Sequence, residues 1–335
     1  MKPRVWVDRP LTSEALDRLK TMIEVIVSND AADLPGVDAV IIGSGVSADA
    51  AFMDQAGPTL KAIVRTGIGV DNVDIPAATE RGILVVHTPD APTESTAEHA
   101  VAMLLALAKR IGGGDMSLRG KEIARSRLLG TEVRNRVLGV VGLGRIGRRV
   151  AEICAQGLKM RVVAYDPYLE SDQAGALGVE MVDNLDALLE RADFVTLHTP
   201  LTAETRHLIG ERELRRMKQG AYLINVSRGP VVDEAALARV VESGHLAGAA
   251  LDVFEPEPPA PNNPLFRLSN VVVTPHIAAY TDRSEQGKWG GATQQMLQVL
   301  RGERPPFLVN PEAWPGRVQL ISRSPQPRGR GSREQ

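Results

Sequence analysis

One arginine, three acids and one histidine follow the ends of three apolar segments in the second half of the chain. They are Arg228 after Tyr222–Val226, Asp252, Glu255 and Glu257 at and after the end of Ala249–Val253, and His276 after Val271–Thr274. An arginine can hold a carboxylate with paired donors, and a histidine can give a proton to a carbonyl oxygen. A carboxylate beside that histidine favours the imidazolium. Together these side chains suit hydride transfer to a 2-oxo acid.

Each of these residues also has an ordinary structural interpretation. Arg228 could make surface contacts at the start of a helix, His276 could be a histidine satisfied within its turn, and the acids could cap a proline-rich loop. Parallel strands place their carboxyl ends at one edge of a sheet, which is where ligands bind in such folds. Since the residues follow three strands of one predicted sheet, we favour the functional interpretation.

A glycine-rich turn precedes these residues. Gly142-Leu143-Gly144-Arg145-Ile146-Gly147 follows the apolar run Val137–Val141, and Asp166 follows the apolar run Arg161–Tyr165. Such glycines allow a tight turn and a close approach to a pyrophosphate, and the carboxylate can accept the hydroxyls of an adenosine ribose. The alternative is a glycine-rich turn in an ordinary α/β domain. The acid would repel a 2′-phosphate, so the pattern favours NAD over NADP.

Short apolar segments alternate with helical patterns along most of the chain. The first series of expected strands is Arg4–Val7, Glu24–Val27, Ala39–Ile42, Leu60–Val64 and Ile83–Val86, with helices near 12–22, 47–56 and 75–81. The second series is Val137–Val141, Arg161–Tyr165, Phe194–Leu197, Tyr222–Val226, Ala249–Val253 and Val271–Thr274, with helices near 184–191, 211–218 and 233–243. This alternation predicts an α/β protein with two Rossmann-like domains built on doubly wound parallel sheets.

Two longer helical patterns set the expected domain order. Ser95–Arg110 is apolar on most faces, and Gly112–Gly114 are expected to end it. A pattern at 283–301 brings no new strands and is expected to pack on the first domain. The nucleotide domain, 106–283, is then inserted into a discontinuous substrate domain, 1–105 plus 284–312. Residues 316–335, rich in Arg, Ser, Pro and Gly, are expected to be disordered.

Composition narrows the class of protein. The chain has 335 residues, 43% of them apolar and 24% charged, with a net charge of −2, which points to no nucleic acid or membrane partner. Neither a signal-peptide pattern nor a membrane-length apolar run is present, so a cytoplasmic protein is expected. No metal-binding spacing of cysteine or histidine is found, and Cys154 is expected to be a small buried hydrophobe.

The chain resembles the D-isomer-specific 2-hydroxyacid dehydrogenases over about residues 40–312. The matching stretches are GIGVDNVD from Gly67, AEH from Ala97, VGLGRIG from Val141, LHTPLT from Leu197, NVSRGPVVDE from Asn225, ALDVFEPEP from Ala250 and TPHI from Thr274. The resemblance implies that Arg228 binds the substrate, that Glu257 pairs with the acid–base His276, and that the Ile68 and Gly69 amides hold the substrate carboxylate. It also implies a homodimer built through the nucleotide domain.

The expected site residues follow from these motifs. The catalytic set is Arg228, Glu257 and His276, and the substrate-binding set is Gly67, Ile68 and Gly69, whose glycines could form an anion nest or only a turn. The resemblance places Asp252 by the nicotinamide. The full cofactor-binding set is Gly142, Gly144, Arg145, Ile146, Gly147, Asp166, His198, Pro200, Thr205, Val226, Ser227, Asp252 and Ala278.

Departures from the family pattern bear on the substrate. Ile42-Gly43-Ser44-Gly45 replaces a loop that carries an arginine in phosphoglycerate members, and His87 stands where Asn is frequent. We therefore expect an NAD-dependent enzyme acting on a small D-2-hydroxy or 2-oxo acid of the hydroxypyruvate or glyoxylate type. The alternatives are a D-3-phosphoglycerate dehydrogenase and, in a different class, an NAD(H)-sensing corepressor-like binding protein.

Overall fold

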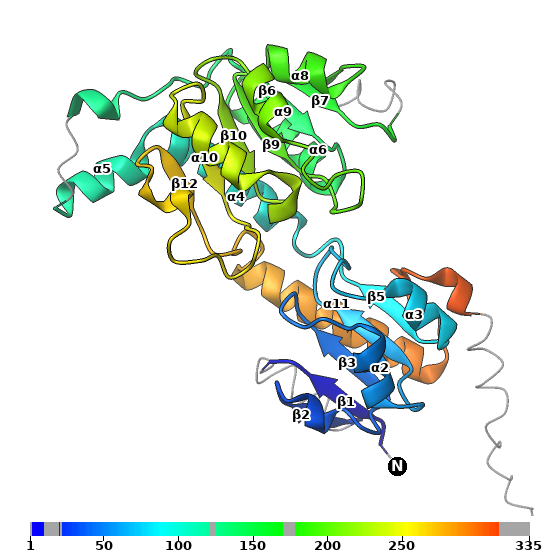
Figure 1. Ribbon diagram of the computed structural model, residues 1–335. Helices are drawn as coiled ribbons and strands as arrows, with labels where there is room; N and C mark the ends of the chain where they lie inside the picture. The colour runs from blue at the N-terminus through cyan, green and yellow to red at the C-terminus, as the bar shows by residue number, and fades with distance from the viewer. Residues whose placement is uncertain (1, 10–19, 21, 121–124, 170–177, 315–335) are drawn as a thin grey trace, which may run out of the picture. The chain divides into compact units, whose positions relative to one another are not determined.

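The computed structural model describes residues 2–9, 20, 22–120, 125–169 and 178–314. The chain divides into two compact units, unit 1 with Met1–Ala91 and Glu285–Gln335, and unit 2 with Pro92–Ser284. Each unit is a parallel sheet flanked by helices (Figure 1). The predicted α/β class is confirmed. The expected helix near 12–22, apart from residues 20 and 22, and the expected disordered tail lie outside the described residues.

Unit 1 is built on a five-stranded sheet in the order β2-β1-β3-β4-β5, with every pair parallel. The strands are β1 Arg4–Val7, β2 Glu24–Val27, β3 Ala39–Ile42, β4 Ala62–Arg65 and β5 Leu84–His87. Its helices are α2 Ala50–Ala56, α3 Ile75–Glu80 and α11 Asp282–Arg301. Asp49 and Asp74 cap α2 and α3 by accepting main-chain N–H groups of the first turn.

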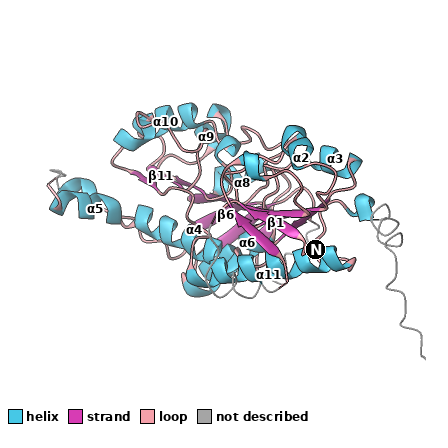
Figure 2. Ribbon diagram, turned by 90° about the horizontal axis from the view of Figure 1, so that it is seen from below, coloured by secondary structure: helices cyan, strands magenta, loops and turns pink. Residues whose placement is uncertain are grey.

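Successive residues of the unit 1 strands point to opposite faces of the sheet, because the side-chain period of a strand is two. Ile41 and Val64 pack against Trp289 and Met296 of α11 on one face. Their neighbours Val40 and Ile63 belong to the other face, together with α2 and α3. Figure 2 shows α11 below the sheet and α2 and α3 above it. Strands covered on both faces explain the nearly continuous apolar runs in the sequence.

The edge strand β5 depends on residues from the C-terminal part of the chain. Leu308 forms an antiparallel bridge with Val86, and the His87 N–H donates to the Phe307 carbonyl. The fully buried Asn310 side chain accepts from the Val85 N–H and donates to the Ile83 carbonyl. Unit 1 is therefore closed by a segment more than 200 residues further along the chain.

Unit 2 is built on a seven-stranded parallel sheet in the order β12-β11-β10-β9-β6-β7-β8. The strands are β6 Val137–Val141, β7 Arg161–Tyr165, β8 Glu180–Met181, β9 Phe194–Leu197, β10 Tyr222–Asn225, β11 Gly248–Leu251 and β12 Val271–Val273. The sheet grows from β6 in both directions, and the direction changes between β6 and β9. Such a reversal leaves a crevice at the carboxyl ends of the two strands, where nucleotides bind.

Helices cover both faces of this sheet (Figure 2). One face holds α4 Thr93–Ala108 and α6 Arg145–Glu152, whose apolar residues pack with Leu138 and Val140. The other holds α8 Leu185–Arg191, α9 Glu211–Arg216 and α10 Glu234–Glu242, which pack with Val137 and Val141. Cys154 lies in the first of these cores, where burial raises the pKa of its thiol to about 12. Its predicted role as a buried hydrophobe is confirmed.

The structure corrects one expectation about the helices. Gly112–Gly114 do not follow the long helix as a terminator, but lie inside a further helix, α5 Ile111–Leu118. The break falls earlier, at Arg110, whose φ of 56° is left-handed. Glycine is unfavourable in a helix, but a Cβ on Gly113 would lie 3.1 Å from a methyl group of Leu128. The missing side chain lets that leucine approach the helix closely.

Candidate active site

The glycine turn of unit 2 contains two glycines that the protein's own packing requires. Gly142 has a φ of +88°, and a Cβ there would lie 2.8 Å from the His198 carbonyl oxygen. A Cβ on Gly147 would lie 2.1 Å from the Gly142 carbonyl oxygen, so any larger residue must displace the turn. These two glycines allow β6, the turn and α6 to pack closely.

Gly144 differs from these two glycines. It precedes the first residue of α6, has a φ of −72°, and a Cβ there would meet nothing within 4 Å. The space above an exposed helix N-terminus, where main-chain N–H groups lack helical partners, suits an anionic group. The turn therefore fits the pyrophosphate of a dinucleotide. Arg145 is exposed and Ile146 half-buried beside it.

Asp166 lies directly after β7 and closes onto the glycine turn. Its carboxylate accepts the Leu143 N–H at 2.9 Å and the Tyr168 N–H at 3.0 Å. These bonds hold the acid beside the turn, and a carboxylate has further lone pairs for hydroxyl donors. The arrangement fits an adenosine ribose next to the pyrophosphate.

His198 lies at the end of β9, next to the turn. Burial lowers the pKa of His198 to about 3, so its ring is neutral at working pH. Its Nε2 lies 3.0 Å from the Thr196 hydroxyl, while its buried Nδ1 has no hydrogen-bond partner among the described residues. In the following loop the Thr205 hydroxyl donates to the Pro200 carbonyl, which closes a tight turn.

Arg228 follows β10 in a turn that the buried Asn225 organises. The Asn225 side chain accepts from the Ser227 N–H and hydroxyl and donates to the Arg228 carbonyl. Val226 and Ser227 are thereby buried. A Cβ on Gly229 would lie 2.1 Å from the main chain of Phe254, so this turn packs directly against the loop that leads to Glu257.

Glu257 and His276 form a hydrogen-bonded pair. The Nδ1 of His276 lies 2.7 Å from Oε2 of Glu257, and each side chain is about one-third exposed (33% and 34%). The other oxygen of Glu257 accepts the Phe254 N–H at 3.0 Å. Because Nδ1 donates to the carboxylate, Nε2 is the nitrogen that can exchange a proton with a ligand.

Asp252, after β11, is fully buried and binds the turn that carries His276. Its carboxylate accepts the Ile277 N–H at 2.9 Å, the Ala278 N–H at 2.8 Å and the Thr274 hydroxyl at 2.6 Å. Burial alone would raise its pKa, but these bonds and one from His99 outweigh burial, so the pKa of Asp252 is lowered. The carboxylate is therefore ionised and fully engaged. Ala278, 4% exposed, is held by it.

Unit 1 contains the turn of Gly67, Ile68 and Gly69, which the sequence predicts to bind the substrate. Gly67 has a φ of +146° and exchanges two hydrogen bonds with Thr88. His87 Nδ1 lies 2.8 Å from the Ile68 carbonyl oxygen. The carbonyl and N–H of a trans peptide point in opposite directions, so this bond directs the Gly69 N–H away from His87. The turn has a defined conformation within its unit.

The structure separates some residues that the strand-end pattern grouped. Glu255 is engaged by Arg206 at 2.6 Å and by His207 at 3.3 Å, so it does not join the His276 pair. Two residues that the strand-end pattern did not select also contribute. Asn225 organises the Arg228 turn, and His99 of α4 contacts Thr274 and Asp252. Both residues stand in quoted family motifs, NVSRGPVVDE and AEH, but the sequence analysis gave neither of them a role.

Among the residues that the structure describes, no group of acids, histidines and cysteines could hold a metal ion. Within the same residues, no helix is both long and apolar enough to cross a bilayer.

The sheet order, the glycine turn and the acid after β7 define a dinucleotide-binding α/β protein. Comparison with known families is consistent with this class: residues 101–278 match the model of the D-isomer specific 2-hydroxyacid dehydrogenase NAD binding domain. The chain belongs to the D-isomer specific 2-hydroxyacid dehydrogenase family. The predicted resemblance and the NAD cofactor are thereby confirmed.

Individual relatives cover most of the chain. It is 44% identical over 306 residues to a D-3-phosphoglycerate dehydrogenase of Archaeoglobus fulgidus (89% of this chain, 58% of that protein). It is 42% identical over 326 residues to a glyoxylate reductase of Korarchaeum cryptofilum (93% and 97%). A D-lactate dehydrogenase structure from Aquifex aeolicus, complexed with NAD and lactic acid, superimposes with a TM-score of 0.82 at 29% identity (92% and 99%). The chain spans 54–59% of the matched phosphoglycerate dehydrogenases.

The two kinds of glycine in the turn predict different effects of substitution. Gly147→Ala should lower the melting temperature without any ligand, because its Cβ meets main-chain atoms. Gly144→Ala, the matched control, should melt like the wild type but bind NADH more weakly, because its Cβ enters the space above α6. Thermal unfolding and NADH titration check both. Normal NADH binding by a folded Gly144→Ala protein would contradict the assigned pyrophosphate position.

Proposed function

We propose that this protein is an NAD-dependent oxidoreductase that interconverts a small D-2-hydroxy acid and its 2-oxo acid. The observation that carries the proposal is the 2.7 Å bond between His276 and Glu257, at the carboxyl ends of strands in a dinucleotide-binding sheet. The glyoxylate reductase and D-lactate dehydrogenase names of matched proteins support it. Small-molecule acids are thus the proposed ligands.

In the proposed reaction, NADH held by unit 2 would supply the hydride that reduces C2 of the oxo acid. His276 gives the proton on Nε2 to the carbonyl oxygen, so that oxo acid, NADH and one proton become hydroxy acid and NAD⁺. Glu257 stabilises the imidazolium that donates this proton. Arg228 holds the substrate carboxylate and polarises the carbonyl. In the reverse direction, neutral His276 accepts the hydroxyl proton.

The remaining site residues carry proposed binding roles. The glycine turn and Asp166 hold the pyrophosphate and ribose, and the residues at the ends of β9 to β12 line the cofactor: His198, Pro200, Thr205, Val226, Ser227, Asp252 and Ala278. Gly67, Ile68 and Gly69 of unit 1 are proposed to hold the substrate carboxylate through main-chain N–H groups. By these roles unit 2 is the nucleotide domain and unit 1 the substrate domain. A cytoplasmic location stays a prediction.

We favour an uncharged substrate tail, as in glyoxylate or hydroxypyruvate. The loop after β3 contains Gly43, Ser44 and Gly45 and has no basic side chain of its own, whereas a phosphate prefers several cationic donors. The Arg9 guanidinium lies against Gly43 and pairs with Asp8 at 3.1 Å. The nearby Arg65 donates to the Asn72 side chain and the Thr66 carbonyl. The second candidate is D-3-phosphoglycerate dehydrogenase, which is the name of several relatives.

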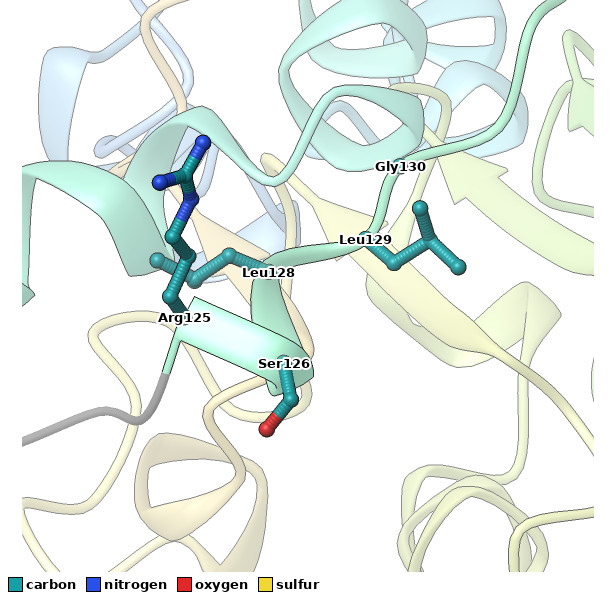
Figure 3. A pocket seen from close by; sticks show the side chains of 5 residues that line it. All are labelled: Arg125, Ser126, Leu128, Leu129 and Gly130. Carbon is teal, nitrogen blue, oxygen red and sulfur yellow. The ribbon is translucent and has the colours of Figure 1, made fainter.

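A homodimer is proposed through an arm of unit 2. The arm comprises α5 and the segment Arg125–Gly130, and α5 extends from the body of its unit (Figure 1). Its apolar residues are unusually exposed: Ile111 (58%), Leu118 (93%) and Leu129 (84%). Figure 3 shows Leu128 and Leu129 lining a hollow with Arg125 and Ser126. Apolar groups on this scale are normally covered, and a second copy supplies a matching surface.

A panel of 2-oxo acids with NADH tests the function and the substrate. We expect a higher kcat/KM for glyoxylate or hydroxypyruvate than for 3-phosphohydroxypyruvate. A clear preference for the phosphorylated acid would identify the second candidate instead. NADH binding without turnover of any acid would favour the sensing protein.

The charge of Asp166 predicts cofactor preference. Wild-type protein should prefer NADH over NADPH, because the carboxylate repels a 2′-phosphate. Asp166→Asn removes the charge but keeps an acceptor for the Leu143 N–H, so it should narrow this preference while retaining more NADH affinity than Asp166→Ala. The kcat/KM values for the two cofactors give the comparison. Equal wild-type values would rule the preference out.

The acid–base pair predicts losses of rate when either partner is replaced. His276→Ala should lower kcat for reduction by about 10²–10⁴-fold with NADH binding nearly unchanged. Glu257→Gln removes the carboxylate charge beside the imidazole and should also lower kcat for reduction. His245→Gln, whose Nε2 contacts the Met217 carbonyl, is the control and should keep normal kcat. A Glu257→Gln protein with normal kcat would show that the pair is misassigned.

The arm predicts the state of assembly. Leu118→Glu with Leu129→Glu should convert a dimer to a monomer, because charges would be buried at the interface. Val27→Lys, an exposed position of unit 1, should leave the dimer intact. Sedimentation equilibrium distinguishes the two. A dimer that survives the double substitution would place the interface elsewhere.

A further inference from the structure

The two halves of the Glu257–His276 pair lie on separate turns. His276 lies in the turn 274–278 after β12, and Glu257 lies in the loop 254–257 after β11. A 2.7 Å bond between side chains on two turns requires both turns to hold their positions. The contacts that hold them come from residues outside the pair.

The turn 274–278 is held by Asp252 through three consecutive amides. The His276 N–H donates to the Asp252 carbonyl at 2.7 Å, and the Ile277 and Ala278 N–H groups donate to its carboxylate. His276 has a φ of 52°, in the left-handed region that is unfavourable for a non-glycine residue. The amide contacts hold the turn in this conformation and fix the direction of the imidazole.

His99 extends this network from α4. Its Nε2 lies 3.1 Å from the Thr274 hydroxyl oxygen and 3.5 Å from the nearer Asp252 oxygen. The Thr274 hydroxyl has a single proton, and it donates that proton to Asp252 at 2.6 Å. His99 must therefore be the donor to Thr274. The two hydrogen bonds then run in one direction, from His99 to Thr274 and from Thr274 to Asp252. These hydrogen bonds connect α4 to the turn of His276.

Glu234, the first residue of α10, holds the other turn. One of its oxygens accepts the Glu255 N–H, and the other accepts the Asn263 side-chain N–H at 2.8 Å. Burial raises the pKa of Glu234 above its ordinary value, although these donors oppose the effect. Each oxygen of Glu234 accepts one N–H group. A glutamine at this position would replace one acceptor oxygen with an NH₂ group and lose one of the two hydrogen bonds. Glu255 is two residues before Glu257.

We propose that His99 and Glu234 are positioning residues for the proton-transferring pair. His99 acts through Thr274 and Asp252 on the turn of His276, and Glu234 acts through the Glu255 main chain on the loop of Glu257. Neither residue contacts the reacting atoms. The inference rests on the proposed function of the pair, and it assigns a role to the His99 of AEH and the Glu234 of VVDE.

Two double-mutant cycles test the proposal. His99→Leu should lower kcat for glyoxylate or hydroxypyruvate reduction by about 10- to 10²-fold, the scale of a small misplacement, with NADH affinity retained. In a His276→Ala background the same change should have almost no further effect, because its route runs through the absent imidazole. Glu234→Gln should likewise lower kcat in the wild-type background and have almost no further effect in a Glu257→Gln background. Glu242→Gln, exposed near the end of α10, is the control.

Two variants of Thr274 test the same hydrogen bonds if the His99→Leu protein does not fold. Thr274→Ser keeps the hydroxyl and should keep most of kcat, whereas Thr274→Val removes it at equal size and should lose kcat as His99→Leu does. Equal losses in both backgrounds, or a Thr274→Val protein with normal kcat, would overturn the inference while the proposed function stands. An unaffected His276→Ala protein would instead overturn the proposed function.

Discussion

The carboxylate of Asp252 is a charge removed from water, and the arrangement of the carboxyl end of the unit 2 sheet depends on it. An ionised group in such a place is tolerated only when its oxygens are fully hydrogen-bonded. Here the donors come from a hydroxyl and from consecutive main-chain amides of one turn. Leaving a buried polar group without its partner costs about 1–3 kcal/mol. Moving the turn would break these hydrogen bonds and leave the Asp252 carboxylate unsatisfied. The turn therefore keeps its position, and His276 is held in place within it.

The features that could be predicted from the sequence are those that depend on local patterns of neighbouring residues. Alternation of apolar strands and helices located the sheets because burial on both faces imposes it, and β6 and β7 have the bounds that the pattern indicates. The strand-end rule brought His276 and Glu257 to one edge, since parallel strands share their direction. The prediction that Gly112–Gly114 end the helix was wrong, because the low helix propensity of glycine is only a local preference that packing can outweigh. The packing contact between Gly113 and Leu128 could not be predicted from the sequence.

The contacts that organise the site were not predictable in the same way. His99 and Thr274 are 175 positions apart, and nothing in their local sequence indicates a hydrogen bond between them. Glu255 illustrates the converse, because its spacing from Asp252 resembles that of Glu257, yet Arg206 and His207 engage it. Spacing identifies the edge of a sheet at which a side chain emerges. Which neighbour it then meets depends on segments that the sheet brings together from elsewhere.

The dependence of β5 on residues 307–310 has a consequence for the order in which the chain acquires structure during synthesis. The described strands of unit 2 pair within residues 137–273, and the helices that cover them, α4, α6, α8, α9 and α10, lie between residues 93 and 242. The ribosome adds roughly 5–20 residues per second, and domains generally fold as units. All of unit 2 has thus been synthesised before Leu308 and Asn310, which complete the pairing of β5. The part of the chain that emerges first is the part whose sheet is finished last.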